Sequence, residues 1–302
     1  MLKISTQHSI IASRYGLEDT LNILSEAGFE AVDLSITGAV LKWDEDFLTD
    51  PFCPEFAEYF RNISKYAKER NLEICMTHAP YCRTWVSEPE AYAEVQQQTI
   101  RGIYANKYLG SPYTVAHPVL HPDFDNGENK ERCLQTNLDY FSAFVPALKE
   151  TGVIMCIENL FRGVWGKPKI PNACSNPVDL AELIDRLNEM HGPLFAACLD
   201  TGHAKICGQD PTQALKVLAH RVKVLHVNDN DGVYDIHTAP GLGVIDWESW
   251  MKALKEIGYN GCLNFETDSN WDLARKNYCN RQVMVSSAKL LYDLGRSLLA
   301  IE

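Results

Sequence analysis

The chain has 302 residues, of which 46% are hydrophobic and 23% are charged, a balance typical of soluble globular proteins. This composition excludes a collagen-like repeat, a coiled coil and a disordered chain. With 28 basic and 40 acidic residues, the formal net charge is −12. That charge argues against nucleic acid or a membrane surface as the main partner.

The lengths of the apolar segments and the spacing of the cysteines indicate the cellular compartment of the protein. Apolar runs such as 153–157 are far shorter than the roughly 20 residues of a membrane helix. The first ten residues lack the charged-then-apolar layout of a secretion signal. The ten cysteines are scattered, without a CxxC pair, which is typical of free thiols in a reducing compartment. We therefore expect a cytoplasmic protein without membrane contact.

Short β-rich apolar runs alternate with amphipathic helical stretches along the whole chain. Strands are expected at 2–6, 29–36, 72–80, 112–118, 153–159, 194–202, 222–229 and 261–268. Helices are expected at 17–27, 54–70, 89–109, 130–150, 177–189, 211–219, 247–257 and 273–299. Some helices begin with a capping side chain followed by proline, as at Asn176-Pro177 and Asp210-Pro211.

This alternation indicates a parallel sheet that is covered by helices. Eight strand–helix units in a chain of this length are typical of a closed (β/α)8 barrel. An open doubly wound sheet would need a phosphate-binding loop after the first strand, and the segment STQHSI is not one. We expect an α/β protein with a single domain, residues 1–302, folded as a (β/α)8 TIM barrel of eight parallel strands with outer helices.

In such a barrel the active site lies where the strands end and the following loops begin. Metal-binding side chains stand at six consecutive strand ends and in the loop after the seventh strand: His78, His117, Glu158, Asp200, His203, His226, Asp235, His237 and Glu266. Burial of so many ionisable groups is costly unless a cation offsets the charge. Carboxylates and imidazoles without thiolates suit Mn, Co, Mg, Fe(II) or Zn.

The minimal site takes one residue from each of the last four strands, namely Glu158, Asp200, His226 and Glu266. One divalent ion is the simplest expectation for these four residues. The five other residues extend the set far enough to bind two or three ions.

The same residues stand in a series of short motifs in a fixed order. They are HAPY (78–81), AHP (116–118), IEN (157–159), LDTGHA (199–204), HVND (226–229), DIHTAPGLGVIDW (235–247) and FETD (265–268). This ordered series resembles the xylose isomerase-like barrel superfamily, which includes sugar and sugar-phosphate isomerases and epimerases as well as endonuclease IV-type AP endonucleases.

Resemblance to the epimerase branch implies that Glu158, Asp200, His226 and Glu266 bind one divalent metal ion. The two glutamates then serve as acid and base around an enediolate, and His203 contacts a substrate hydroxyl. Ketose 3-epimerases of that branch usually carry a further glutamate soon after the ligand at the end of the fifth strand. This sequence reads LFRGVWG there.

Resemblance to the endonuclease IV branch implies that all nine residues bind up to three zinc ions in a phosphodiesterase. DNA cleavage also needs cationic loops, and basic residues at the expected mouth are few. A metal-dependent isomerase or epimerase is therefore the main expectation, with an AP endonuclease as the alternative. Another lyase, dehydratase or hydrolase of the same barrel and a metal-stabilised sugar-binding module are also retained.

Three residues near the mouth are expected to bind substrate. Arg83 and Trp85 follow His78, and Arg162 lies in a long loop after the fifth strand that is suited to close over a phosphorylated or carboxylated molecule. The expected partner is a small sugar or sugar phosphate. The acidic surface and apolar outer helices are compatible with a homodimer or homotetramer.

Overall fold

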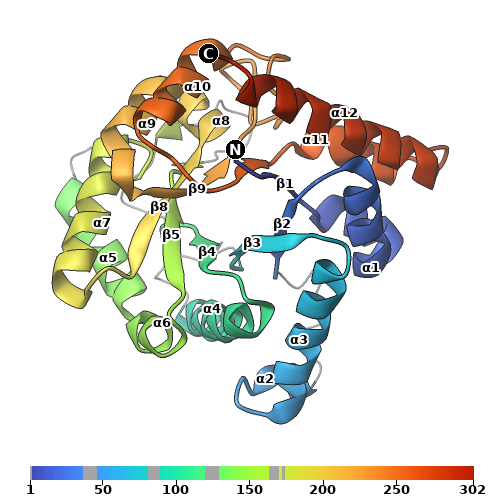
Figure 1. The fold of residues 1–302 in the computed structure, drawn as a ribbon. Coiled ribbons are helices and arrows are strands. Elements are labelled where there is room, and N and C mark those ends of the chain that lie inside the picture. Colours follow the sequence, from blue (N-terminus) through green and yellow to red (C-terminus); the bar gives the residue numbers. More distant parts are fainter. Residues whose placement is uncertain (1, 37–45, 81–88, 120–128, 163–169, 172–173) are drawn as a thin grey trace.

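The computed structural model describes residues 2–36, 46–80, 89–119, 129–162, 170–171 and 174–302. Parallel strands form a barrel inside a ring of helices (Figure 1). The barrel strands are β1 (Ile4–Gln7), β2 (Ala31–Ser35), β3 (Glu73–His78), β4 (Tyr113–Ala116), β5 (Ile154–Glu158), β8 (Phe195–Asp200), β9 (Val222–His226) and β10 (Leu263–Phe265). They pair in the order β10-β1-β2-β3-β4-β5-β8-β9, and a parallel bridge from Val227 to Phe265 joins the two ends of the sheet. The expected (β/α)8 TIM barrel is confirmed.

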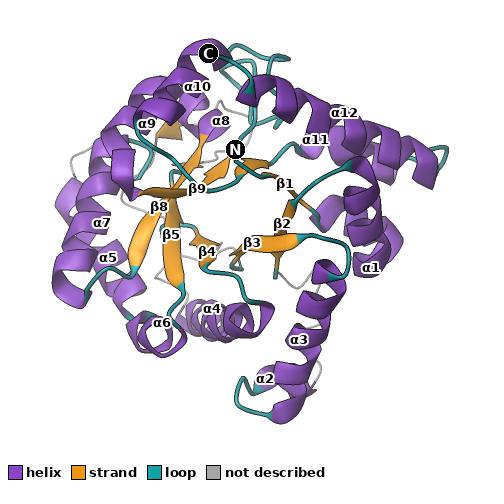
Figure 2. Cartoon of the chain, in the orientation of Figure 1, coloured by secondary structure: helices purple, strands orange, loops and turns teal. Residues whose placement is uncertain are grey.

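Helices cover the outside of the barrel (Figure 2). The longer ones are α1 (Ser9–Ala27), α3 (Pro54–Lys68), α4 (Pro89–Leu109), α5 (Lys130–Ser142), α7 (Pro177–His191), α9 (Pro211–Leu218), α10 (Trp247–Glu256) and α12 (Arg281–Leu299). Shorter helices are α2 (Asp46–Thr49), α6 (Val145–Thr151), α8 (Thr201–Ile206), α11 (Asp268–Trp271), η1 (Ala219–Arg221) and η2 (Asp272–Arg275). A small antiparallel hairpin, β6 (Phe161–Arg162) with β7 (Ile170–Pro171), follows β5.

Three expected helices are wrong in their extent. The helix expected at 17–27 is the second part of α1, which begins at Ser9 and is interrupted at Gly16, where φ is +75°. The helix expected at 130–150 is two helices, because Pro146, the second residue of α6, cannot donate a backbone hydrogen bond to the preceding turn. The helix expected from residue 273 starts at Arg281, where the side chain of Asn280 accepts a hydrogen bond from the backbone N–H of Val283. Residues 268–275 form α11 and η2 instead.

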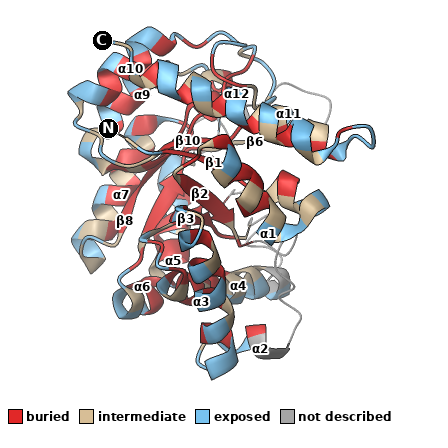
Figure 3. Cartoon of the chain, turned by 45° about the vertical axis from the view of Figure 1, so that its right-hand side comes forward, coloured by how far each residue is buried: buried red, intermediate tan, exposed pale blue. Residues whose placement is uncertain are grey.

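The strands are buried on both faces (Figure 3), as expected for a parallel barrel covered by helices. Alternation along each strand divides the apolar residues into two groups. On β5, Met155 and Ile157 pack with the outer helices, whereas Cys156 belongs to a separate group inside the barrel. All nine cysteines in the described segments are free, in agreement with the expectation of free thiols. Among the described helices, none is long and apolar enough to cross a membrane.

His8 lies at the amino terminus of α1 and is fully buried. Its Nδ1 lies 3.2 Å from the backbone oxygen of Asp33. Burial opposes protonation of the ring and lowers its pKa to about 4. The unfolded chain, where a histidine pKa is about 6.5, therefore binds the proton more readily than the folded chain.

His8 consequently contributes stability above pH 6.5 that is lost as the pH falls toward 4. We expect the wild-type free energy of unfolding to fall by up to about 3 kcal/mol more over this interval than that of His8→Gln. Urea unfolding of both proteins at several pH values measures the difference. Parallel pH profiles for the two proteins would contradict the assignment.

Candidate metal centre at the carboxyl ends of the strands

Strand alternation brings the sequence-predicted carboxylates and imidazoles into the barrel. Cys156, Cys198 and Val224 lie in the interior group, and the residue two positions after each of them points to the same side. Those residues are Glu158, Asp200 and His226, the last residues of β5, β8 and β9. All three are buried. The candidate site therefore occupies the interior at the carboxyl-terminal end of the barrel.

The four residues of the minimal metal site converge. Glu158, Asp200, His226 and Glu266 each offer one ligand atom, and these atoms lie within 4.8 Å of one another. The Nδ1 atom of His226 lies 3.1 Å from Oε1 of Glu158 and 3.2 Å from Oε2 of Glu266. Despite this proximity, neither ring nitrogen of His226 has a hydrogen-bond partner among the described residues. A divalent ion would satisfy the nitrogen that faces the two glutamates.

Two further histidines extend the centre beside Glu158. Oε2 of this glutamate lies 2.9 Å from Nε2 of His117, which follows β4, and 3.4 Å from Nε2 of His78, the last residue of β3. His78, Glu158 and His226 form a second group with ligand atoms at metal-binding separations.

The loop after β9 supplies the remaining two residues. The Oδ1 atom of Asp235 lies 2.9 Å from Nε2 of His237 and 3.6 Å from Nε2 of His203. Asp200, His203 and His237 form a third group of potential ligands, and this group shares no residue with the one around His78. The structure thus brings all nine sequence-predicted residues together.

Three of the histidines are oriented by the same kind of contact, from Nδ1 to a backbone oxygen. The Nδ1 atoms of His78, His203 and His237 lie 2.8, 3.0 and 3.0 Å from the backbone oxygens of Ala79, Asn159 and Glu266. A carbonyl oxygen only accepts hydrogen bonds, so each Nδ1 carries a hydrogen. Because the neutral ring then keeps a lone pair on Nε2, these contacts direct a metal-binding atom into the centre. The donor set and its orientation fit a divalent cation.

The two glutamates of the centre experience opposite electrostatic environments. Burial opposes ionisation of Glu158, but attraction by His226 and His117 outweighs it and holds the pKa of Glu158 well below its usual range. Burial and repulsion by Glu158 and Asp200 raise the pKa of Glu266 well above its usual range.

Three histidines are shifted toward the protonated form by the surrounding carboxylates. Burial opposes protonation of His226, but Glu158 outweighs burial and raises its pKa. Burial opposes protonation of His203, but Asp200, Glu158 and Asp235 outweigh burial and raise its pKa to about 10. The same balance, with Asp235 as the strongest attraction, raises the pKa of His237 to about 9. Binding of a metal ion would therefore have to displace protons from these rings.

The sequence analysis missed one carboxylate beneath the centre. Asp33 on β2 is buried, and its Oδ2 lies 3.7 Å from Nε2 of His226, on the side of the ring opposite the glutamates. Burial raises the pKa of Asp33, although His226 and His78 oppose the shift. A charged residue within the apolar run 29–36 was the available signal, but it lies mid-strand rather than at a strand end.

The expected substrate-binding residues are only partly placed by the structure. Arg83 and Trp85 lie outside the described residues. Arg162 lies on β6 and is half-buried. Its neighbour Phe161 packs edge-on against His203, with 4.9 Å between ring centroids, so the β6–β7 hairpin lies beside the centre.

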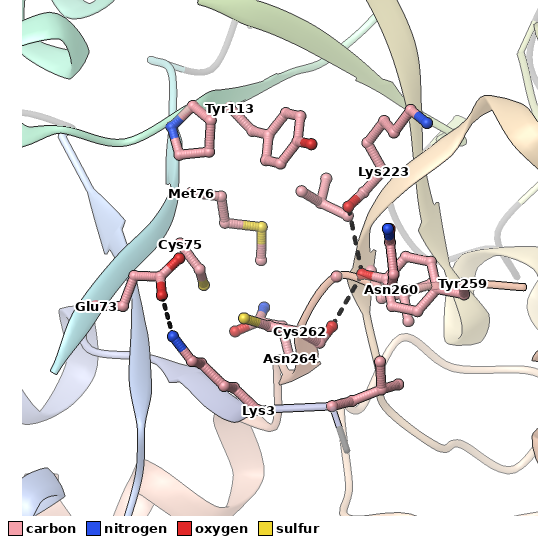
Figure 4. Close-up of a pocket in the computed structure, with 15 residues that line it drawn as sticks. Lys3, Glu73, Cys75, Met76, Tyr113, Lys223, Tyr259, Asn260, Cys262 and Asn264 are labelled. Carbon is pink, nitrogen blue, oxygen red and sulfur yellow. Dashed lines mark hydrogen bonds and ion pairs between the residues drawn. The ribbon is translucent and has the colours of Figure 1, made fainter.

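A cavity of about 400 Å³ lies at the opposite end of the barrel (Figure 4). It is lined by residues at the amino-terminal ends of the strands, among them Lys3, which forms an ion pair with Glu73, and Tyr113. Cys75 and Cys262 also face this space (Figure 4). Its lining includes none of the nine residues of the metal centre, so it is separate from the candidate site.

The family model described as "Xylose isomerase-like TIM barrel" matches residues 21–285. An uncharacterised protein of Methanocaldococcus jannaschii, MJ1311, is 26% identical over 88% of this chain and 84% of its own length. An inosose dehydratase of Clostridium tetani is 33% identical over 33% of this chain and 39% of its own length. A probable endonuclease 4 of Mycoplasma mobile is 26% identical over 65% of this chain and 67% of its own length.

Solved structures share the fold at low sequence identity. A D-tagatose 3-epimerase-like protein superposes with a TM-score of 0.71 at 21% identity, covering 98% of both chains. The IolI protein with a bound zinc atom superposes with a TM-score of 0.73 at 16% identity, covering 99% of this chain and 98% of its own.

Removal and return of metal tests the centre. Adding Mn²⁺ or Zn²⁺ to EDTA-treated protein is expected to raise Tm progressively, with about 2.7 kcal/mol of stabilisation at a metal concentration 100 times Kd. Asp200→Asn removes a buried carboxylate and is expected to reduce this rise. Asp139→Asn, at an exposed position of α5, is the matched control. A wild-type Tm that does not respond to metal would contradict the assignment.

Proposed function

The chain belongs to the xylose isomerase-like TIM barrel family, and we propose that it is a divalent-metal-dependent isomerase or epimerase acting on a sugar or sugar phosphate. Relatives and structural neighbours with named activities are enzymes, including sugar epimerases and inosose dehydratases. The observation that carries the proposal is the convergence of two buried glutamates, from β5 and from the end of β10, on His226 and Asp200.

The proposed metal ligands are Glu158, Asp200, His226 and Glu266. When bound there, a divalent cation would supply a positive charge that polarises a substrate carbonyl and the neighbouring hydroxyl, which acidifies the hydrogen on the carbon between them. The zinc atom in the IolI structure supports this choice of cofactor.

Glu158 and Glu266 are the proposed acid and base. They enter the centre from different strands. Oε1 of Glu158 and Oε2 of Glu266 both approach Nδ1 of His226, at 3.1 and 3.2 Å. One glutamate would take a proton from the substrate carbon, and the other would return a proton to it or to its neighbour. Because both carboxylates are buried, little bulk water reaches the reacting carbon during a turnover, whereas the carboxyl groups exchange their protons with solvent between turnovers.

The substrate contacts are proposed from the residues that border the centre. His203 has its Nε2 directed toward Asp235 rather than into the four-residue group. When only the four-residue group holds an ion, we assign His203 to a substrate hydroxyl. Arg162 on the adjacent hairpin provides a cation for a phosphate or carboxylate group.

The second candidate function is a multi-zinc phosphodiesterase of the endonuclease IV type. It is favoured by the two additional ligand groups, around His78 and around His237, that share no residue, and by the similarity to the probable endonuclease 4. The net charge of −12 weighs against a DNA substrate, because binding to a phosphate backbone depends on cationic surface.

Solvent exchange tests the acid–base assignment. In D₂O, the wild-type protein is expected to replace the reacting carbon-bound hydrogen of a ketose or ketose phosphate by deuterium, followed by loss of its NMR signal. Glu158→Gln and Glu266→Gln are each expected to lower this rate at least about 100-fold, with metal content measured in parallel. Glu248→Gln, an exposed residue of α10, is the control. Exchange at the wild-type rate in both site variants would overturn the mechanism.

DNA incision distinguishes the second candidate. A duplex with one abasic site is expected to remain intact with the purified protein under conditions in which the sugar exchange proceeds. Cleavage that is lost in EDTA and in His237→Ala would replace the isomerase assignment by the phosphodiesterase.

A further inference from the structure

Asp229 forms an unusual concentration of hydrogen bonds next to the metal centre. It follows β9 by three residues and is fully buried. Its Oδ1 accepts hydrogen bonds from the backbone N–H groups of Asn230 (2.9 Å), Val244 (3.0 Å) and Ile245 (3.2 Å). Its Oδ2 accepts from the backbone N–H of Gly241 (3.0 Å) and from Nε1 of Trp247 (2.8 Å). Five donors thus surround one carboxylate, so its oxygens are already engaged within the protein.

These bonds fix the segment 230–247, which contains two residues of the metal centre. The backbone of Asp229 also pairs with Thr238 in both directions, at 2.8 and 2.9 Å. Thr238 directly follows His237. Asp229 therefore holds the segment near its middle through its backbone and near its end through its carboxylate.

The sequence PGLGVIDW at 240–247 is explained by this carboxylate. Gly241 has φ +86°, a conformation that favours glycine. A Cβ atom on Gly243 would lie 2.3 Å from Oδ1 of Asp229 and 2.2 Å from the backbone oxygen of Asn230. Only glycine allows the backbone to approach the carboxylate this closely, and Trp247 then closes the cage with its indole N–H.

His237 requires such support. Its φ of +45° is uncommon for a residue with a side chain. Its ring nonetheless lies between the backbone oxygen of Glu266 at 3.0 Å and Oδ1 of Asp235 at 2.9 Å. A strained backbone persists only where its surroundings fix it, and the neighbouring pairing of Thr238 with Asp229 provides this constraint.

We propose that Asp229 is a positioning residue, which holds the segment 230–247 so that Asp235 and His237 complete a metal site with Asp200 and His203. This site would be occupied in addition to the ion of the four-residue group. The inference rests on the proposed metal-dependent function. Asp229 itself would touch neither the metal ion nor the substrate.

The test is metal binding by Asp229→Asn, measured by equilibrium dialysis with Zn²⁺ and elemental analysis of EDTA-treated protein. An amide nitrogen cannot accept the hydrogen bonds that one carboxylate oxygen accepts, so the segment loses part of its anchor. We expect wild type to bind more than one Zn²⁺ per chain. Asp229→Asn should lose at least tenfold in affinity for the ion that Asp235→Asn also weakens, and retain the ion that Glu266→Gln weakens.

Asp246→Asn is the matched control, because it removes the same charge from the same segment. Its carboxylate accepts a hydrogen bond from the backbone N–H of Ser249 and caps α10. It takes no part in the hydrogen bonds around Asp229, so we expect Asp246→Asn to bind both ions as wild type does. Hydrogen exchange of the metal-free protein gives an independent readout. Amides at 235–245 should exchange at least tenfold faster in Asp229→Asn than in Asp246→Asn. A general loss of stability would not weaken one ion selectively.

Equal affinities in Asp229→Asn and wild type would overturn the inference. A wild-type protein that binds one ion, insensitive to Asp235→Asn, would also overturn it while leaving the four-residue site intact. A wild type that binds no ion would overturn the proposed function itself. If Asp229→Asn does not fold, Trp247→Phe removes only one donor from the cage. It must then weaken the same ion selectively, and unchanged binding in that variant would overturn the inference.

Discussion

The candidate site depends on one electrostatic constraint, which is the exclusion of many ionisable groups from water at one end of the barrel. Four carboxylates and five imidazoles meet there, and their side chains are at most 21% exposed. Carboxylates at such separations repel one another unless a cation lies among them. The raised pKa values of His203 and His237 indicate that protonated rings supply part of that charge when no metal ion is bound. A divalent ion bound there would compensate the same carboxylates with a charge that is fixed in place.

Two features of the barrel place these groups, namely the ends of the strands and the backbone oxygens beside the imidazole rings. Glu158, Asp200 and His226 are the last residues of hydrogen-bonded strands, so the sheet fixes the positions of their backbones. Backbone oxygens then orient the rings of His78, His203 and His237. The one long segment that contains candidate ligands, 230–247, is anchored by Asp229, the residue that precedes it. These candidate ligands are thus held by contacts within the protein that do not involve a metal ion.

The sequence predicts the barrel and most residues of the centre because both follow simple periodicities, whereas Asp235 and His237 are predicted from the motif DIHTAPGLGVIDW in the loop after the seventh strand. A strand that is buried on both faces reads as an apolar run, and a polar residue at its carboxyl end falls at the mouth. Asp33 and Asp229 escape this argument. Asp33 lies mid-strand, and its relation to His226 depends on the closure of the barrel. Four of the five donors to the carboxylate of Asp229 lie 12 to 18 residues away, in an irregular loop and at the first residue of α10, where no periodicity applies. The break between α5 and α6 was signalled by Pro146, but the apolar pattern continues across it.

The most direct test of the central claim is a crystal structure with anomalous diffraction data collected above and below the absorption edge of the bound metal. We expect a metal peak among Glu158, Asp200, His226 and Glu266, with Nδ1 rather than Nε2 of His226 toward the ion. Anomalous density elsewhere, or a folded protein without density at this position in saturating Mn²⁺ or Zn²⁺, would contradict the account.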